Sequence, residues 1–332
     1  RRGSWMSFRE IVSNPKLRHL FFGGKGGVGK TVIAAGAAYY ISETLGRRVL
    51  LSSTNPVHSL SSCFGKDFWG KGICHVDGTS NLDVIEIDTT KTVEGYKESV
   101  RNKIMNFLKT AGITTDPEPF VEAATTNPAF EEAAMFDEMV NILLGEKYDV
   151  YVFDTAPVAH TYRLLGMSKV YDLWLRKMVK SREEALSTRL KLSFRKEKIL
   201  EEIKKDPLLL ETLEMRRRTE EAKRLLTDRE KTAFFFVTLP LALPIAVIER
   251  FIGWVRTFEI PVGGVVMNCV IPEEEVKTST SPYIVNKLRE QAHYIQDACK
   301  RFPGMICAYV PLFETEVRDL QMISRVAEAL AK

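Results

Sequence analysis

The sequence contains few cysteines and no pair of them at a spacing typical of metal binding. Its 332 residues include only five, Cys63, Cys74, Cys269, Cys299 and Cys307, which are scattered and form no C-x-x-C motif. An odd and dispersed set argues against a disulfide framework and is typical of reduced thiols in a cytosol. We therefore expect a cytoplasmic protein in which most cysteines are core residues.

The sequence also lacks an apolar run long enough to cross a membrane. The longest apolar stretch, 234–248, is shorter than the roughly 20 residues that a membrane helix needs, and Pro240 and Pro244 interrupt it. This stretch indicates a strand, a loop and a helix. No signal peptide is visible, and we expect residues 1–5, which precede the first methionine, Met6, to be left over from a cloning vector.

A large excess of charge of one sign is absent as well. The net charge is +4, the isoelectric point is near 8.7, and basic residues are interspersed with acidic ones. We therefore expect no nucleic-acid partner; an anionic nucleotide, or an anionic membrane surface reached through a partner, would account for the charge. With 45% apolar residues, the chain can form one large α/β domain or one domain with an elaboration.

The sequence does contain a glycine loop between an expected strand and an expected helix. The loop 23–31 follows the apolar run 17–22 and precedes the small apolar residues 32–38. Residues 24–31 fit the phosphate-binding pattern G-x-x-x-x-G-K-S/T, in which backbone N–H groups surround phosphate oxygens at a helix N-terminus. We expect nucleotide binding by Gly24, Lys25, Gly26, Gly27, Val28, Gly29, Lys30, Thr31 and Val32.

Three side chains have predicted roles at the phosphates. Lys30 should reach the β- and γ-phosphates, and the Thr31 hydroxyl should bind Mg²⁺. Asp154 ends the expected strand 148–154 and should bind the same ion through water, as a Walker B aspartate does. The alternatives are a glycine-rich turn without a ligand, and an aspartate that only caps a turn or helix.

Strands and helices alternate along most of the chain. Besides 17–22 and 148–154, apolar runs predict strands at 48–53, 82–87, 233–238, 263–268 and 305–310. Helices are expected at 93–109, at 129–144, and from Pro244, Pro282 and Thr315. This alternation predicts an α/β fold with a doubly wound, mainly parallel sheet that is covered on both faces.

Residues 169–229 depart from this alternation. They give only helical and highly charged patterns, with apolar residues at helical spacing in the first part. We expect a helical subdomain inserted into one P-loop domain of residues 6–332. Its apolar face would receive a cargo or partner through Val170, Trp174 and Met178, together with Met167 just before the subdomain. The alternative is that this face packs against the core.

Lys25, the second lysine of the glycine loop, provides the first resemblance to a known class. The loop resembles the deviant Walker A loop of the MinD/ParA/nitrogenase-iron-protein class, in which this lysine reaches phosphates bound by the other subunit. The alternative is a solvated surface lysine. Segments 54–60, 127–132, 153–157 and 310–318 extend the likeness over nearly everything after Met6. With them, the chain resembles the arsenical pump-driving ATPase (ArsA) family, which includes ATPases that guide tail-anchored proteins to membranes.

This resemblance implies a P-loop NTPase that binds ATP or ADP with Mg²⁺ and acts as a homodimer. The implied catalytic residues are Lys25, Lys30 and Asn55. Asn268 would hydrogen-bond the adenine, beside Pro311, Leu312 and Phe313; the alternative for Asn268 is a turn former at a strand end. The implied switch residues, which respond to the γ-phosphate, are Pro56, His58, Thr155, Pro157 and His160.

The chain departs from the family at three places. Family members carry an aspartate at the position of Asn55, which orients the attacking water. An amide cannot take a proton, so we expect ATP binding with slow hydrolysis, whether the substitution is natural or introduced. Residues 281–284 replace the zinc-binding C-x-x-C of the tail-anchor branch, so we expect no structural zinc. Segments 120–135 and 164–178 lack the metalloid-binding cysteines of arsenite-pump members.

The resemblance therefore favours an ATP-dependent homodimeric switch that captures and releases a hydrophobic cargo such as a tail-anchored membrane protein. One alternative is the ATPase subunit of an arsenite or antimonite efflux pump, which needs a membrane partner. Another is an ATP-binding scaffold with little hydrolysis. Cys63, Cys74 and His75 are a further alternative, as a soft-metal site.

Overall fold

The computed structural model describes residues 6–53, 59–110, 114–126, 129–154, 207–272 and 281–332, together with Arg176, Lys180 and Glu184. The chain folds as two compact units. The first is built from residues 1–89, 145–162 and 226–332, and the second from residues 90–144 and 163–225. Within the described ranges, no helix is both long and apolar enough to cross a membrane.

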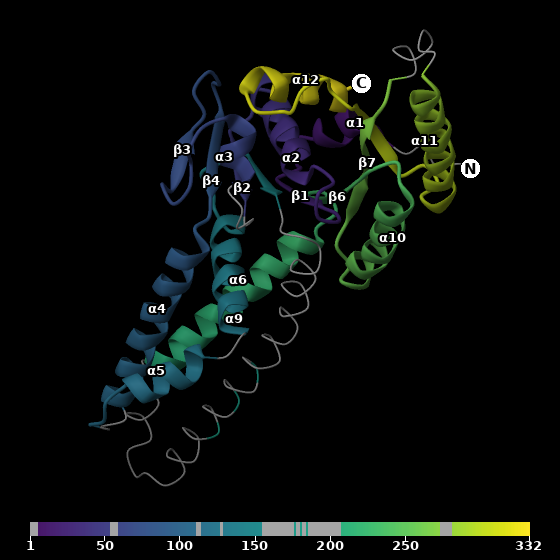
Figure 1. Ribbon diagram of the computed structural model, residues 1–332. Helices are drawn as coiled ribbons and strands as arrows, with labels where there is room; N and C mark the ends of the chain where they lie inside the picture. Colours follow the sequence, from purple (N-terminus) through teal and green to yellow (C-terminus); the bar gives the residue numbers. More distant parts are fainter. Residues whose placement is uncertain are drawn as a thin grey trace. The chain divides into compact units, whose positions relative to one another are not determined.

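The first unit contains an eight-stranded sheet in the order β3-β4-β2-β5-β1-β6-β7-β8 (Figure 1). Its strands are β1 (His19–Gly23), β2 (Val49–Ser53), β3 (Ile73–His75), β4 (Leu82–Glu86), β5 (Val150–Asp154), β6 (Thr232–Thr238), β7 (Val262–Val270) and β8 (Ile306–Pro311). Neighbouring strands pair in parallel except for β3, which is antiparallel to β4. The predicted mainly parallel sheet is confirmed, and each predicted strand is present within two residues of its predicted bounds.

Successive residues of the central strands serve opposite faces of the sheet, as the period of two in a strand requires. Leu20 and Phe22 of β1 belong to the core cluster formed with α1, α2 and α12. Phe21 lies on the other face, where its ring stacks on those of Phe153 and Phe234, with centroids 4.5 and 5.9 Å away. Burial on both faces explains why these strands are continuous apolar runs.

The helices of the first unit flank this sheet. They are α1 (Phe8–Val12), α2 (Lys30–Tyr39) with its π-helical continuation η1 (Tyr40–Thr44), α3 (Ser59–Phe64), α10 (Ala242–Thr257), α11 (Pro282–Arg301) and α12 (Leu320–Leu330). α10 packs on β6 and β7, whereas α2 packs on β1, β2 and β5. α2 and α12 lie side by side (Figure 1), and a Cβ added to Gly36 of α2 would lie only 2.5 Å from Cγ1 of Val326.

The prediction of a helix from Thr315 is wrong about where the helix starts. α12 begins at Leu320, because the side chain of Asp319 caps it by accepting a hydrogen bond of 2.8 Å from the backbone N–H of Met322. Four short elements, α1, α3, β3 and α5, have no counterpart among the predicted strands and helices. Elements of three to eight residues offer too few positions for a clear hydrophobic period.

The second unit is helical in its described part. Its helices are α4 (Thr89–Thr110), α5 (Glu118–Thr125), α6 (Ala129–Leu143) and α9 (Pro207–Thr227). α4 and α6 meet where the rings of Tyr96 and Phe130 have centroids 5.1 Å apart. Arg101 of α4 forms a salt bridge of 2.7 Å with Glu118 of α5. The predicted limits 169–229 of a helical subdomain stay a prediction, because most of 169–206 lies outside the described residues.

Candidate functional site

The glycine loop lies at the carboxyl end of β1 and leads directly into α2. Gly27 and Gly29 have left-handed backbone conformations, with φ angles of 81° and 85°, which glycine adopts at no steric cost. Gly29 is also the N-cap of α2. A Cβ at Gly29 would lie 2.4 Å from Nδ2 of Asn268. The left-handed backbone therefore favours glycine at this position, and a side chain here would also displace the Asn268 amide.

Lys30 opens α2 and is buried. Its Nζ donates a hydrogen bond of 3.3 Å to the backbone carbonyl oxygen of Lys25, across the loop. Burial lowers the pKa of Lys30, and the negative charge of Asp154 partly opposes this shift. The ammonium group thus lies inside the curve of the loop, where phosphate oxygens would be stronger acceptors than the carbonyl.

Asp154 ends β5, in register with Phe22 of β1 and Ser53 of β2. Its Oδ2 accepts hydrogen bonds from the hydroxyls of Thr31 at 2.7 Å, Ser53 at 3.0 Å and Ser59 at 3.5 Å. Burial raises the pKa of Asp154 to about 6, although these hydrogen bonds oppose the shift. Residues of two strands, β2 and β5, and of two helices, α2 and α3, therefore meet at one carboxylate.

The second oxygen of this carboxylate fits a hydrated cation. Oδ1 of Asp154 is buried and has no hydrogen-bond partner among the described residues. A carboxylate oxygen beside a threonine hydroxyl is the type of ligand that Mg²⁺ binds directly or through its water shell. The structure brings the predicted metal residues Thr31 and Asp154 together, and their role at a metal stays a prediction. The sequence analysis did not predict a site role for Ser53, and it included Ser59 only within the segment 54–60 that carries the family resemblance.

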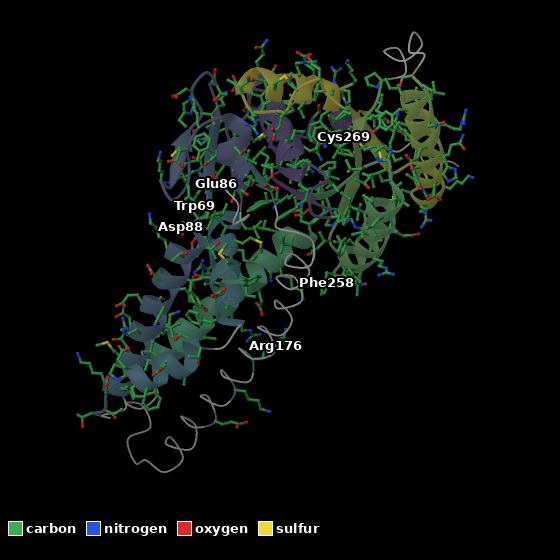
Figure 2. The ribbon with its side chains drawn as sticks, in the orientation of Figure 1. Trp69, Glu86, Asp88, Arg176, Phe258 and Cys269 are labelled. Carbon is green, nitrogen blue, oxygen red and sulfur yellow. The ribbon has the colours of Figure 1, made fainter. Side chains whose placement is uncertain are left out.

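A second buried acid, Glu86, ends β4 in register with Ser53 of β2. Its Oε1 accepts a hydrogen bond of 2.9 Å from the backbone N–H of Leu60, and its Oε2 accepts one from the hydroxyl of Ser61. These bonds hold the first turn of α3 against the sheet. Glu86 also forms an isolated parallel bridge with Trp69, and Figure 2 labels both residues. The sequence marked Glu86 only as part of a strand.

Asn268 of β7 also contacts the glycine loop. Its buried side chain donates a hydrogen bond of 3.0 Å from Nδ2 to the backbone carbonyl of Val28. The next residue, Cys269, which Figure 2 labels, has a φ of 55°, rare for a residue other than glycine. The register of β7 against β8 also shifts between Met267 and Val270. This irregular strand end accompanies the contact between the Asn268 amide and the loop.

The segment after β8 is attached to the same strand end. The backbone N–H of Leu312 donates a hydrogen bond of 2.9 Å to the carbonyl oxygen of Val270. The guanidinium of Arg325, in α12, lies 4.9 Å from the ring centroid of Phe313. The structure therefore holds the predicted adenine segment 311–313 beside the end of β7, and contact with a base stays a prediction.

Ten predicted residues lie outside the part of the chain that the structure describes. They are the catalytic residue Asn55, the switch residues Pro56, His58, Thr155, Pro157 and His160, and the cargo residues Met167, Val170, Trp174 and Met178. Their roles stay predictions.

The alternative of a soft-metal site at Cys63, Cys74 and His75 finds no support. Burial raises the pKa of the Cys63 thiol to about 12, which disfavours a thiolate ligand. Both ring nitrogens of His75 have partners: Nδ1 lies 2.8 Å from Oδ1 of Asp83, and Nε2 lies 3.0 Å from the Thr79 carbonyl oxygen. Among the described residues, no three His, Cys, Asp or Glu side chains gather as metal ligands.

Comparison with known proteins covers nearly the whole chain. Residues 17–332 match the model of the anion-transporting ATPase family. The chain is 28% identical to ATPase ASNA1 homolog 2 of Paramecium tetraurelia, over 98% of this chain and 97% of that protein. It is 30% identical to ATPase GET3B of Arabidopsis thaliana, over 98% and 81%. A putative arsenical pump-driving ATPase of Halobacterium salinarum is 28% identical, over 97% of this chain but 45% of that protein.

Proposed function

Because the chain belongs to the anion-transporting ATPase family, whose model matches residues 17–332, we propose that it is a homodimeric switch in which Mg-ATP controls the capture of a hydrophobic protein segment. That the chain is an ATPase follows from its family and from the names of its relatives. The pairing of subunits, the rate of hydrolysis and the nature of the cargo are the proposal.

The proposed binding of Mg-ATP is supported most directly by the contact between Thr31 and Asp154, next to Lys30. The Thr31 hydroxyl lies 2.7 Å from the Asp154 carboxylate, whose other oxygen has no hydrogen-bond partner within the described residues. Thr31 and Asp154 would hold Mg²⁺, which supplies charge neutralisation at the phosphates when it is bound. Lys30 would replace its hydrogen bond to the Lys25 carbonyl with one to the phosphates.

The expected role of Lys25 is the reason to propose a dimer. Within its own loop, Lys25 offers a carbonyl oxygen to Lys30. Lys30 is thus the cation that serves the loop of its own chain, and the Lys25 ammonium would serve the nucleotide of a second copy. A two-fold axis between two such loops makes the exchange reciprocal, with each copy supplying one Lys25.

Hydrolysis would be slow in this chain. Asn55 stands where the resemblance places a water-orienting aspartate, and an amide cannot accept the proton of the attacking water. Mg-ATP would then persist in the closed dimer for longer than in relatives that carry the acid. Retention of unhydrolysed ATP also supports the scaffold alternative, in which binding alone performs the function.

For the cargo, we favour a hydrophobic segment of a tail-anchored protein. The relatives from Paramecium and Arabidopsis belong to the ASNA1 and GET3 ATPases, the branch that the sequence resemblance links to such cargo. The absence of cysteines from segments 120–135 and 164–178 argues against metalloid binding. The relative named a putative arsenical pump-driving ATPase is the observation that favours an arsenite efflux subunit as the second candidate.

Co-purification of a client tests the cargo proposal. The protein is co-expressed with a tagged tail-anchored protein, and the amount recovered with it is compared between wild type and the Trp174→Asp/Met178→Asp variant. Trp254→Asp, at an exposed tryptophan of α10, is the control. Recovery by wild type and the control, but not by the double variant, supports the proposal. Absence of any client, together with arsenite stimulation of ATP turnover, would instead identify the pump subunit.

A further inference from the structure

Gln291 of α11 is buried and makes two hydrogen bonds to the backbone of a single residue. Its Oε1 accepts from the N–H of Ile271 at 2.8 Å, and its Nε2 donates to the carbonyl oxygen of Ile271 at 3.0 Å. A side-chain amide that engages both backbone groups of one residue takes the place of a neighbouring strand. The amide therefore fixes the position of the backbone at Ile271 through both its N–H and its carbonyl group.

Ile271 is the first residue after β7, at the point where the regular strand pairing fails. Two residues earlier, Cys269 has its left-handed φ of 55°, and the register with β8 shifts between Met267 and Val270. A strand end without a regular partner leaves backbone groups unpaired unless another group reaches them. Gln291 is the group that pairs with Ile271.

The neighbouring residue Val270 is hydrogen-bonded to a different segment of the chain. Its carbonyl oxygen accepts the hydrogen bond from the backbone N–H of Leu312. Two consecutive residues thus connect the end of β7 to the 311–313 segment and to α11. The position of Asn268, only three residues before Ile271, depends on both attachments.

We propose that Gln291 is a positioning residue for recognition of the nucleotide base, which rests on the proposed binding of ATP and on the adenine contact that the family resemblance predicts for Asn268. A carbonyl only accepts, so the atom of Asn268 that faces Val28 is the amide nitrogen. This leaves one N–H donor and one carbonyl acceptor of the amide for a base. Adenine presents an amino donor next to a ring-nitrogen acceptor, and one asparagine amide can form a hydrogen bond with each of them. Guanine presents an acceptor in place of that amino group.

The discrimination between these bases depends on the position of the amide, because hydrogen bonds weaken steeply when distance and angle deteriorate. Gln291 does not touch the base in this proposal. It acts by holding the strand end that carries Asn268 and the attached Leu312. Loss of Gln291 should therefore affect the base and leave the phosphates to the glycine loop.

The test is a set of calorimetric titrations with Mg-ATP, Mg-GTP and Mg-tripolyphosphate. Gln291→Leu removes both hydrogen bonds, and Gln291→Glu removes only the donor to the Ile271 carbonyl and keeps an acceptor for the Ile271 N–H. Gln296→Leu, at an exposed position of the same helix, is the matched control. We expect Gln291→Leu to weaken Mg-ATP binding roughly tenfold, since a displaced Asn268 amide loses about one hydrogen bond to the base. Affinities for Mg-GTP and Mg-tripolyphosphate should change by less than about twofold, and Gln296→Leu should match wild type.

Each other outcome has a definite meaning. Equal weakening of all three ligands would show a structural role only and overturn the inference, as would an unchanged preference for ATP in Gln291→Leu. If that variant does not fold, the ratio of ATP to tripolyphosphate affinity in Gln291→Glu decides in the same way. Wild-type protein that binds ATP no better than GTP and tripolyphosphate would contradict the adenine site itself, and the inference with it.

Discussion

The hydroxyl of Thr31 lies 2.7 Å from the Oδ2 atom of Asp154, although 123 residues separate the two in the sequence. This bond joins the first turn of α2 to the end of β5. Each hydroxyl donor at this carboxylate binds Oδ2, whereas Oδ1 is buried without a hydrogen-bond partner among the described residues. Asp154 is therefore the residue on which we expect magnesium binding to depend.

Acidification should weaken Mg-ATP binding through Asp154. Burial raises the pKa of this carboxyl to about 6, so the anion that a cation needs is lost as the pH falls through that value. Calorimetric titrations between about pH 5 and pH 8 should show affinity rising with pH in the wild type, and weaker binding with a smaller rise, due to the nucleotide alone, in Asp154→Asn. The nucleotide titrates identically with both proteins, so equal pH profiles would assign the effect to ATP and contradict the prediction.

The same variant should stabilise the protein in the absence of ligand. A carboxyl whose pKa is raised by folding contributes stability below its unfolded pKa of about 4, and this contribution is lost as the pH rises through about 6. At pH 7, Asp154→Asn should raise the free energy of unfolding by about 1–3 kcal/mol. Urea denaturation measures this change.

Asp149, near the start of the same strand, provides the control. Hydrogen bonds with Arg48 lower the pKa of Asp149, so its ionised form is favoured by folding and Asp149→Asn should decrease stability at pH 7. If Asp154→Asn and Asp149→Asn both lowered the free energy of unfolding, the claim that burial disfavours the charged form of Asp154 would be wrong.

Close packing of α2 against α12 requires glycine at Gly36. A Cβ there would meet Cγ1 of Val326 at 2.5 Å and the backbone nitrogen of Ala327 at 3.3 Å. Gly36→Ala should cost about 1–3 kcal/mol of stability through overpacking. Val326→Ala should relieve part of that cost, so that the double variant is more stable than the sum of the single effects predicts.

Gly253→Ala is the matched control for this packing. Gly253 also lies within a helix, α10, and a Cβ there would have no neighbour within 4 Å. This substitution should stabilise the protein by about 0.5–1 kcal/mol, because alanine has the higher helix propensity. Thermal melts measure both variants. Equal melting temperatures for Gly36→Ala and Gly253→Ala would show that the close approach of α2 and α12 does not make a Cβ at Gly36 destabilising.

Asn55→Asp should accelerate ATP turnover. Restoring a carboxylate supplies the proton acceptor that the amide lacks, and general-base catalysis contributes about a hundredfold or more. Steady-state phosphate release measures the gain, and the affinity for Mg-ATP should change little. Asn55→Ser, which restores no acid, should remain slow. An unchanged rate in Asn55→Asp would remove Asn55 from the catalytic assignment.

The sequence was sufficient to predict the sheet, its parallel character and the glycine loop. Buried parallel strands are continuous apolar runs, and the loop has glycines at fixed spacing, so both leave a local signal that needs no knowledge of distant contacts. Gly27 and Gly29 illustrate this, because their left-handed conformations are what the motif demands.

The partners within the site could not be predicted in this way. Ser53, Ser59 and Glu86 are ordinary polar residues in the sequence. The register of β2 with β4 and β5 brings Ser53 and Glu86 to the same edge, and Ser59 reaches Asp154 from α3. Nor does the sequence indicate the left-handed conformation of Cys269, a residue type that rarely adopts it. The predicted start of the last helix at Thr315 is too early, because the sequence alone does not distinguish the cap, Asp319, from the other polar residues that precede α12.

Complementation between two inactive variants tests the central claim, that two copies close on ATP and each lends Lys25 to the other. Lys25→Ala and Lys30→Ala are prepared separately and mixed in equal amounts, and ATP hydrolysis by the mixture is measured. If Lys25 acts on the partner's nucleotide, half of the pairs are mixed and each holds one complete site, so the mixture should recover about a quarter of the wild-type rate. A mixture no more active than the two separate variants would contradict the account.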